Sequence, residues 1–261
     1  MSAELAYRRE GGVVHIQLTR PAKRNALTSS MIDELRDAVE AAEAADARVI
    51  VLSGGDGFFC AGADIAGYRD AAQDPAVLAD FTERAKALCV ELTTTRAVVI
   101  AAVDGVAMGG GFELVLSADL VIASDRSRFG LPEISLGLIP GWGGTQRLAR
   151  VFGANRAKYA VLTGEPIPVE AALAAGIVSR VVAPHELERV VDELAAALAS
   201  RAPLALAAAK AAVTEAIDPQ HGEDAGSALE TRLLLDLFAS ADGREGVAAF
   251  LDKRTPEFVG R

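Results

Sequence analysis

Two glutamates near the middle of the chain stand among apolar residues, where an acidic side chain is unusual. Glu113 follows three consecutive glycines in "MGGGFELVLSADL" (108–120), and Glu133 lies in "FGLPEISLG" (129–137). Burial among apolar residues raises the pKa of a carboxyl group toward neutrality, which suits a general acid or base. A glutamate near a helix start also serves as a cap or dipole partner, so spacing alone leaves both interpretations open.

Three glycine-containing loops follow apolar runs that are typical of buried strands. They are "GGDGFFCAGADI" (54–65), "DGVAMGGGFE" (104–113) and "FGLPEISLGLIPGWGG" (129–144). Glycine lets backbone N–H groups approach an acceptor closely, and two N–H groups that converge on one oxygen form an oxyanion hole. If a helix opens at "GGGFELVLSA", its first N–H groups are free and its positive dipole end points at the ligand. Ligand sites are commonly built on loops at strand ends, so we expect a site there.

Several common catalytic and cofactor motifs are absent from the sequence. It contains no GxxxxGK[ST], no complete GxGxxG, no GxSxG and no HExxH, which excludes the usual nucleotide, hydrolase and zinc-protease signatures. The histidines, His15, His185 and His221, are widely scattered and show no metal-ligand spacing. Cys60 and Cys89 form no CxxC pair and do not indicate a disulfide framework. We therefore predict no metal site.

Composition and charge narrow the class of protein. The chain has 261 residues, of which 51% are hydrophobic and 24% charged, as in globular proteins. A net charge of −10 argues against a nucleic-acid partner, although local basic clusters such as "RPAKR" (20–24) and "DKR" (252–254) are compatible with an anionic small ligand. The best apolar run, 98–106, is interrupted by Asp104 and is too short to span a bilayer. With no secretory signal visible, we expect a cytoplasmic protein without a membrane partner.

Apolar runs that alternate with helical segments indicate an α/β architecture. The predicted strands cover residues 12–18, 47–52, 96–103 and 119–124. Residues 20–30 form a loop in this interpretation, and a helix follows from near Ser30, with Asp33 as its capping-box partner. The predicted buried face of that helix contains Ile32, Leu35 and Val39.

After about residue 184 the pattern becomes helical. Apolar residues recur at helical spacing at Leu187, Val190, Val191, Leu194 and Leu198. "SRAP" (200–203) breaks this helix, and alanine-rich helices continue toward the end. We therefore divide the chain into a core, 1–200, and a C-terminal helical region, 201–261, packed on the core or on a neighbouring subunit. The segment 66–95 is expected to contain a helix that lines the ligand site.

Several segments, taken in order, resemble the enoyl-CoA hydratase/isomerase (crotonase) superfamily. They are "NAL" (25–27), "FCAGADI" (59–65), "AAVDGVAMGGGFELVLSADLVIAS" (101–124), "FGLPEISLGLIPGWGGTQRL" (129–148) and "EGVAAFLDKRTPEF" (245–258). The resemblance implies a spiral core of repeated ββα units and C-terminal helices that trimerise, with trimers often pairing into hexamers. It also implies an acyl-CoA thioester as substrate, so that coenzyme A belongs to the substrate and no separate cofactor is needed.

The resemblance assigns roles to particular residues. The backbone N–H groups of Ala63 and Gly110 would form an oxyanion hole for the thioester enolate. Residues implied to bind CoA lie along the channel at Ala61, Asp64 and Ile65, and near the nucleotide end at Lys23, Arg24 and Ala26. Lys253 and Phe258 would reach the CoA of a neighbouring subunit.

The two glutamates decide the expected reaction, because hydratases of this superfamily carry both. The resemblance implies syn addition of water across a trans-2-enoyl-CoA, with Glu113 as base, Glu133 as proton donor to Cα, and the Gly141 N–H positioning the water. One alternative is a double-bond isomerase that shuttles a proton with a single glutamate. Another is an acyl-CoA-binding subunit without catalysis.

Two positions depart from the usual pattern. Ala66 stands where many hydratases carry a lysine, which puts one CoA contact in doubt, and Trp142 fills a position in "PGWGG" that is often small. The indole either shapes the acyl pocket or simply packs. The preferred acyl chain, the pathway served and the choice between trimer and hexamer stay open.

Overall fold

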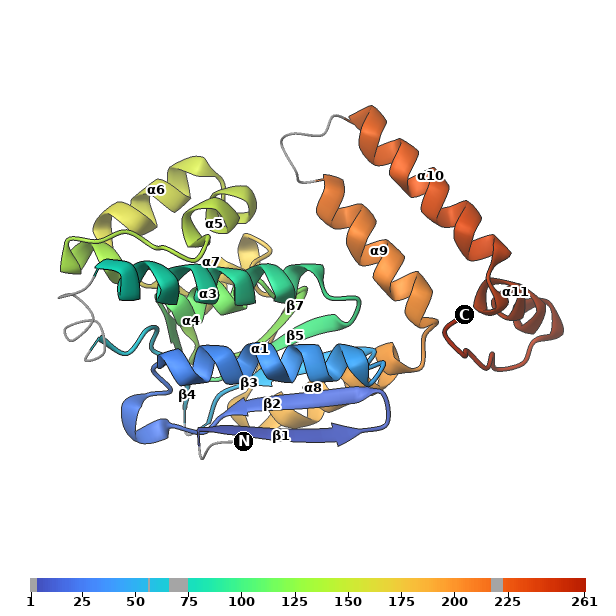
Figure 1. The fold of residues 1–261 in the computed structure, drawn as a ribbon, viewed down its shortest axis with the longest axis horizontal. Coiled ribbons are helices and arrows are strands. Elements are labelled where there is room, and N and C mark those ends of the chain that lie inside the picture. Colours follow the sequence, from blue (N-terminus) through green and yellow to red (C-terminus); the bar gives the residue numbers. More distant parts are fainter. Residues whose placement is uncertain (1–3, 56, 66–74, 217–222) are drawn as a thin grey trace.

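The computed structural model describes residues 4–55, 57–65, 75–216 and 223–261, which form two sheets covered by helices (Figure 1). The larger sheet comprises, in spatial order, β1 (Leu5–Glu10), β2 (Val13–Leu18), β3 (Val49–Ser53), β5 (Val98–Val103), β7 (Leu120–Ser124) and β10 (Arg180–Val182). Its neighbouring strands are parallel except in the β1–β2 hairpin. The α/β class and the four predicted strands are confirmed. The largely exposed edge strand β1 was not predicted.

A second sheet of very short strands lies mostly within the glycine-rich connections, with one strand further along the chain. It comprises β4 (Phe58–Cys60), β6 (Val106–Met108), β8 (Arg128–Gly130) and β9 (Ile167–Pro168). Our interpretation of the glycine-rich connections as loops alone was wrong, because β4, β6 and β8 have three residues each and are too short to show a periodic pattern. From β3 to α5, three successive turns of the chain each add one strand to the larger sheet, one strand to the second sheet and then a helix, which confirms the ββα spiral implied by the resemblance.

Two long helices lie side by side over the larger sheet (Figure 1). They are α1 (Ser29–Ala44) and α3 (Pro75–Thr94). The predicted buried face of α1, formed by Ile32, Leu35 and Val39, is confirmed. The predicted helix within 66–95 is α3, whereas Ala66 lies outside the described residues.

The predicted capping box at the start of α1 is wrong. The N-cap is Thr28 rather than Ser30, and the Thr28 hydroxyl accepts the N–H of Met31 at 3.2 Å. Asp33 instead accepts hydrogen bonds of 2.7 and 2.6 Å from the Arg84 guanidinium of α3. A charged partner from a distant part of the chain therefore replaces the local contact.

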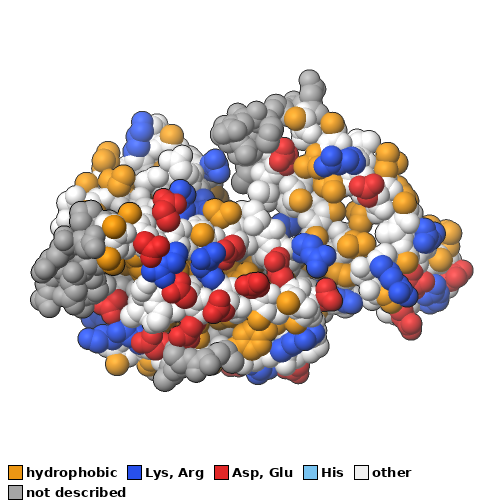
Figure 2. Space-filling view, viewed as in Figure 1, with side chains coloured by type: hydrophobic (Ala, Val, Ile, Leu, Met, Phe, Trp, Pro, Cys, Tyr) orange, Lys and Arg blue, Asp and Glu red, His pale blue; other side chains and the backbone are white. Residues whose placement is uncertain are grey.

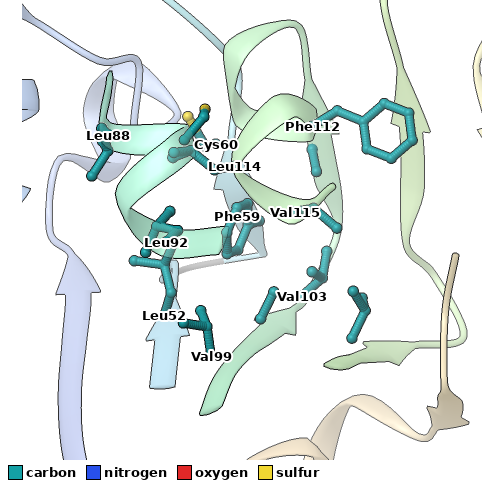
Figure 3. Packing of buried hydrophobic residues seen from close by; sticks show 14 of the residues in the cluster. Leu52, Phe59, Cys60, Leu88, Leu92, Val99, Val103, Phe112, Leu114 and Val115 are labelled. Atoms are coloured by element: carbon teal, nitrogen blue, oxygen red, sulfur yellow. The ribbon is translucent and has the colours of Figure 1, made fainter. Parts of the chain in front are cut away.

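The short helix α4 (Gly110–Val115) sits between α3 and the strands (Figure 3). All six of its residues are buried. Leu114 packs in the same cluster as Leu88 and Leu92 of α3 and Phe59 of β4. Close packing on every side fixes α4, and with it any side chain that it carries.

The opposite face of the larger sheet is covered by α8 (Leu187–Ala199). Val49 and Val51 of β3 pack with α8, whereas Ile50 and Leu52 pack into the other cluster, because successive side chains of a strand point to opposite faces. Both faces of the sheet are thus buried, which explains the continuous apolar runs in its strands.

The remaining helical elements of the core are short. They are η1 (Pro21–Lys23), η2 (Pro132–Leu136), α5 (Gly144–Phe152), α6 (Ala154–Thr163), α7 (Val169–Ala174) and η3 (Pro184–Glu186). The segment predicted as a loop at 20–30 therefore contains η1 and the start of α1. The turn between η2 and α5 contributes to the candidate site described below.

The C-terminal region consists of three helices that lean away from the core (Figure 1). They are α9 (Pro203–Ala216), α10 (Glu223–Ala239) and α11 (Ala241–Asp252). The expected helices are present, and the predicted break at 200–203 coincides with the start of α9.

A lysine on α9 anchors this region to the core. The Lys210 ammonium lies 2.8 Å from Oδ2 of Asp119 and donates to the carbonyls of Leu92 and Ala97 at 3.1 Å. The same Oδ2 atom accepts the N–H of Val99 at 2.7 Å. Only 7% of the Lys210 side chain is exposed. An ion pair between a buried lysine and a partly exposed aspartate therefore connects α9 to β5 and its neighbours.

Among the described residues, no single helix is long and apolar enough to cross a membrane. One pair, Pro184–Ala199 with Pro203–Ala216, has the required length and composition only when taken together, and it is bent by 106° at the break. The apolar face of α8 within this pair packs on the larger sheet.

We predict that Lys210→Met destabilises the protein, since it leaves the Leu92 and Ala97 carbonyls without their donor and the Asp119 carboxylate without its cation. Losing hydrogen bonds to a charged group in this way lowers the free energy of unfolding by about 1.5 to 3 kcal/mol, which denaturant titration would measure. Lys86→Met is the matched control, because Lys86 pairs with Glu83 on an exposed surface and should change the free energy of unfolding by less than about 0.5 kcal/mol. Equal effects of the two substitutions would contradict the anchoring role.

Candidate active site

Glu113 lies on α4 with 1% of its surface exposed. Its Oε1 atom accepts two hydrogen bonds of 2.7 Å, from the backbone N–H groups of Trp142 and Gly144. Both donors come from the turn between η2 and α5. A Cβ atom on Gly144 would lie 2.8 Å from Cγ of Glu113, so a glycine is needed for this N–H to reach the carboxylate. The carboxylate and the turn therefore fix each other's positions.

The electrostatic surroundings adjust the acidity of Glu113. Burial raises its pKa to about 7, and the negative charge of Glu133 acts in the same direction. The N–H groups of Gly144 and Trp142 and the positive charge of Arg147 partly oppose this rise. A carboxyl group with such a pKa exchanges protons readily near neutral pH.

Glu133 lies on η2, half-buried, directly against the start of α4. A Cβ atom on Gly109 would lie 3.1 Å from Oε1 of Glu133. The Oε2 atom is buried and has no hydrogen-bond partner within the part of the chain that the structure describes. Burial raises the pKa of Glu133 above its ordinary value. Buried polar atoms normally have partners, so this oxygen marks a place where a water or a ligand group would bind.

The triple glycine opens α4 with an unusual backbone conformation. Gly109 has φ of 52° and ψ of −128°, a combination that side-chain-bearing residues rarely adopt. Its N–H donates to the carbonyl of Gly130 at 2.9 Å, and its carbonyl accepts the N–H of Glu113 at 3.0 Å. Gly110 is the first residue of the helix, so its N–H has no intrahelical acceptor.

The second predicted N–H donor, Ala63, lies on the neighbouring loop. Leu27 pairs with Ala63 in a parallel bridge, donating to the Gly62 carbonyl and accepting the N–H of Asp64, both at 2.8 Å. Because alternate groups of a paired segment face its partner, the Ala63 N–H between them points away from Leu27. A Cβ atom on Gly62 would lie 3.3 Å from the Gly110 nitrogen. The loops that carry the two predicted donors are therefore in contact.

The residues expected to bind CoA within one subunit fall on two adjoining segments. They are Lys23, Arg24 and Ala26 on one segment, and Ala61, Asp64 and Ile65 on the other. The N–H of Ala61 donates to the Arg24 carbonyl at 3.0 Å, which holds the segments together. The Arg24 guanidinium lies 5.6 Å above the Phe58 ring, and Ile65 is 56% exposed. Cationic and apolar groups thus lie side by side at the surface.

Two residues that sequence reasoning left without a role organise these segments. Arg20 donates to Oδ2 of Asp64 at 2.7 Å and to the Ala26 carbonyl at 2.9 Å. Asn25 is fully buried, accepts the N–H of Arg20 and donates to the Phe58 carbonyl, both at 2.9 Å. Arg20 belongs to the basic "RPAKR" cluster and Asn25 to "NAL", but neither stretch signals these long-range contacts. The Asp64 carboxylate is therefore held by Arg20.

Trp142 lies in the 129–144 loop, and its side chain contacts the triple glycine of the 104–113 loop. Its indole is 3% exposed and contacts the Phe81 ring of α3 edge-on, with ring centroids 5.8 Å apart. A Cβ atom on Gly110 would lie 2.7 Å from Cε3 of the indole and closer still to Cζ3 and Cη2. The indole therefore covers Gly110 directly. Its role in the acyl pocket stays a prediction.

Three predicted site residues make no hydrogen bond to Glu113 or Glu133 within the part of the chain that the structure describes. Gly141 is exposed, and the N–H groups that reach Glu113 belong to the residues that follow it in the turn. Lys253 is exposed at the end of α11, and the Phe258 carbonyl accepts a hydrogen bond from Arg48 at 3.2 Å. Figure 1 shows α11 at the opposite end of the molecule from the start of α1. Within one subunit these two C-terminal residues do not join the site.

The cysteines sit in the core rather than at a reactive surface. Cys60 and Cys89 are both buried and free, and burial raises the pKa of each thiol to about 12. Such thiols stay protonated and inert at neutral pH. In the described ranges, no group of three or more His, Cys, Asp or Glu side chains could hold a metal ion.

Comparison with known proteins places this geometry in a family. The family model described as enoyl-CoA hydratase/isomerase matches residues 8–261. The 2,3-dehydroadipyl-CoA hydratase of Escherichia coli K12 is 40% identical over 260 residues, covering 99% of this chain and all of that protein. The mitochondrial enoyl-CoA hydratase of Pongo abelii is 39% identical, covering 93% of this chain and 82% of its own length. The crystal structure of an enoyl-CoA hydratase from Bacillus anthracis superposes with a TM-score of 0.92 at 34% identity, covering 99% of this chain and all of that one.

Gly110→Ala is predicted to displace the Trp142 indole, because the new methyl group and the ring cannot occupy the same space. Trp142 is the only tryptophan in the chain, so its fluorescence emission should shift toward that of an exposed indole. Gly226→Ala is the control, since a Cβ atom there would meet nothing within 4 Å, and its emission should match the wild type. An unshifted spectrum for Gly110→Ala would show that the ring does not cover this glycine.

Proposed function

Because this chain belongs to the enoyl-CoA hydratase/isomerase family and is most like its hydratases, we propose that it catalyses reversible syn hydration of a trans-2-enoyl-CoA to a 3-hydroxyacyl-CoA. One observation carries this proposal. Two carboxyl groups with raised pKa values flank the start of α4, Glu113 held by two N–H groups and Glu133 with a buried oxygen that has no partner. Two such acids can hold a water and transfer its protons.

Glu113 acts as the base in the proposed reaction. Its Oε1 atom is occupied by two N–H groups, and Oε2 accepts no hydrogen bond from the described residues, so Oε2 is the atom that takes the proton. Removing a proton from the water produces the nucleophile that bonds to C3 of the enoyl group. The π electrons then move toward the thioester oxygen and form an enolate.

Glu133 supplies the second proton. Its carboxyl O–H donates to C2, which restores the thioester carbonyl and completes the addition of H and OH to one face of the double bond. Glu113 must afterwards release its proton and Glu133 must regain one. The enolate oxygen would accept the N–H groups of Ala63 and Gly110, which is supported by the contact between their loops and by the missing intrahelical acceptor of Gly110.

The CoA portion would lie along the adjoining segments at 23–27 and 61–65. The exposed Lys23 and Arg24 suit its phosphates, and the exposed Ile65 suits its apolar pantetheine arm. CoA is part of the substrate, so the proposed reaction needs no separate cofactor.

A homotrimer, or a hexamer of two trimers, is part of the proposal. Figure 2 shows hydrophobic side chains gathered over α10 and α11. The exposed large hydrophobic residues of these helices are Leu234, Leu235, Phe238, Val247, Phe250 and Leu251. Burying such a surface against another copy removes it from water. The same assembly would bring Lys253 and Phe258 of one copy toward the CoA of its neighbour.

The test is loss of the enoyl-thioester ultraviolet absorbance when the purified protein meets crotonyl-CoA or a longer 2-enoyl-CoA. An isomerase would instead convert a 3-enoyl-CoA and leave the 2-enoyl-CoA unhydrated. A subunit that only binds acyl-CoA would bind the thioester tightly without turnover. Either result would overturn the proposed reaction.

Glu113→Gln and Glu133→Gln are each predicted to lower hydration by about 10²- to 10⁴-fold, as loss of a general acid or base does. Glutamine is nearly isosteric, and at position 113 its Oε1 atom can accept the same two N–H groups, so the fold should persist. Circular dichroism and binding of a CoA thioester are the controls. If either variant hydrated the substrate at the wild-type rate, the role assigned to that glutamate would be wrong.

Trp142→Ala is predicted to extend the range of accepted acyl chains, because it removes the indole that covers Gly110 beside Glu113. The measurement is kcat/KM for crotonyl-CoA, a longer 2-enoyl-CoA and 2,3-dehydroadipyl-CoA, which the name of the Escherichia coli relative suggests. Phe81→Leu is the control, since it removes the edge contact but keeps the indole itself, and it should alter the order of preference less. An unchanged profile for Trp142→Ala would mean that the indole only packs.

A further inference from the structure

Arg147 of α5 is placed behind the turn that holds Glu113. Its guanidinium donates to the Trp142 carbonyl at 2.8 Å, while the N–H of the same Trp142 donates to Oε1 of Glu113 at 2.7 Å. The guanidinium also lies against Gly143, where an added Cβ atom would overlap Nη1 and lie 3.3 Å from Cζ. Through these contacts the Arg147 side chain packs against the turn on the side away from Glu113.

The anchoring of Arg147 differs from that of three arginines that pair with acids. Arg20, Arg36 and Arg84 each contact a carboxylate within 3.0 Å. Arg147 forms no ion pair with any acid in the described part of the chain, and its side-chain hydrogen bond goes to a backbone carbonyl. Its positive charge is therefore not neutralised by a contacting acid.

We propose that Arg147 is a positioning residue, which fixes the 142–144 turn so that its two N–H groups hold the carboxylate of Glu113 in place for proton transfer. This inference rests on the proposed function for its catalytic consequence. The geometry that carries it is the chain of contacts from the guanidinium to the Trp142 carbonyl, and from the Trp142 N–H to the acid.

The charge of Arg147 supports the same role. Groups that face Glu113 from the elements packed around it are Glu133 on η2, which raises its pKa, and Arg147 on α5, which lowers it. The Cys89 thiol on α3 is neutral, since burial raises its pKa to about 12. Removing Arg147 would take away a cation and loosen two N–H donors. Both changes disfavour the carboxylate, so the pKa of Glu113 should move upward.

A matched control lies on the same helix. Arg147 and Arg150 both line a cavity of about 540 Å³ between the core and α9, together with Ser117 and Asp119. Arg150 is exposed and makes no hydrogen bond to the 142–144 turn within the described residues. Replacing Arg150 therefore removes the same charge from the same cavity without touching the turn.

The experiment compares Arg147→Gln, Arg147→Lys and Arg150→Gln with the wild type in two measurements. One is the pH dependence of kcat and KM for crotonyl-CoA. The other is titration of the Glu113 carboxyl by carbon-13 NMR in protein labelled at glutamate, with the resonance assigned through Glu113→Gln. Arg147→Gln should lower kcat by about tenfold or more with little change in KM, as a misplaced catalytic group does.

The direction of the pH effect follows from the role of Glu113 as a base. Activity rises as Glu113 loses its proton, so a higher pKa moves this rise to higher pH in Arg147→Gln. Arg147→Lys, which keeps the charge, should lie between the wild type and Arg147→Gln, and Arg150→Gln should match the wild type. If Arg147→Gln does not fold, the kinetics and the Glu113 titration of Arg147→Lys still test the proposal.

Two results would overturn the inference: an unchanged Glu113 titration in Arg147→Gln, or an equal shift in Arg150→Gln. The NMR titration does not depend on any reaction. If the wild type failed to hydrate every 2-enoyl-CoA tested, the proposed function would fall, while the Glu113 titration would still decide whether Arg147 holds the acid.

Discussion

A carboxylate with almost no exposure to water must be compensated by groups that the protein itself supplies. Glu113 is compensated on one oxygen by two N–H groups of a distant turn. This constraint shapes its surroundings, because a backbone can reach the carboxylate only where side chains are absent. Gly144 has no room for a Cβ atom beside the acid, and Gly110 has none beneath the indole of the same turn. The glycine-rich loops thus allow three segments to meet around one acid.

The sequence predicted those parts of the fold that repeat an apolar pattern over five or more residues. β3, β5 and β7 are buried on both faces and appear as continuous apolar runs, which identify them without any tertiary information. The strands of the second sheet are too short for a pattern, and their pairing partners lie far apart in the chain. The start of α1 was misassigned for a similar reason, since Asp33 is paired with Arg84 from a helix that follows 42 residues after Asp33.

The residues of the candidate site also differ in how far the sequence predicts them. Both acids were found from the sequence, since an acidic residue in an apolar stretch is visible by its type. The donors that hold Glu113 were not, because a backbone N–H carries no signature and becomes a donor only through its placement. Asn25 and Arg20 were also missed in their roles, as their partners at Phe58 and Asp64 lie on another segment. Side chains that could do chemistry can therefore be identified from the sequence, whereas the backbone groups that bind them can be identified only from the fold.

Trp142 contributes both backbone groups and a side chain to the surroundings of Glu113. Its backbone N–H holds the acid, its carbonyl receives Arg147, and its indole covers the glycine that opens α4. A smaller residue could supply the same backbone groups but would leave the space above Gly110 open. The orientation of Glu113 and the space available beside it thus depend on the same turn. In the reaction we propose, a change of side chain at this position would alter the space beside Glu113 while the hydrogen bonds to the acid persist, so that substrate selectivity and proton transfer would depend on different parts of one residue.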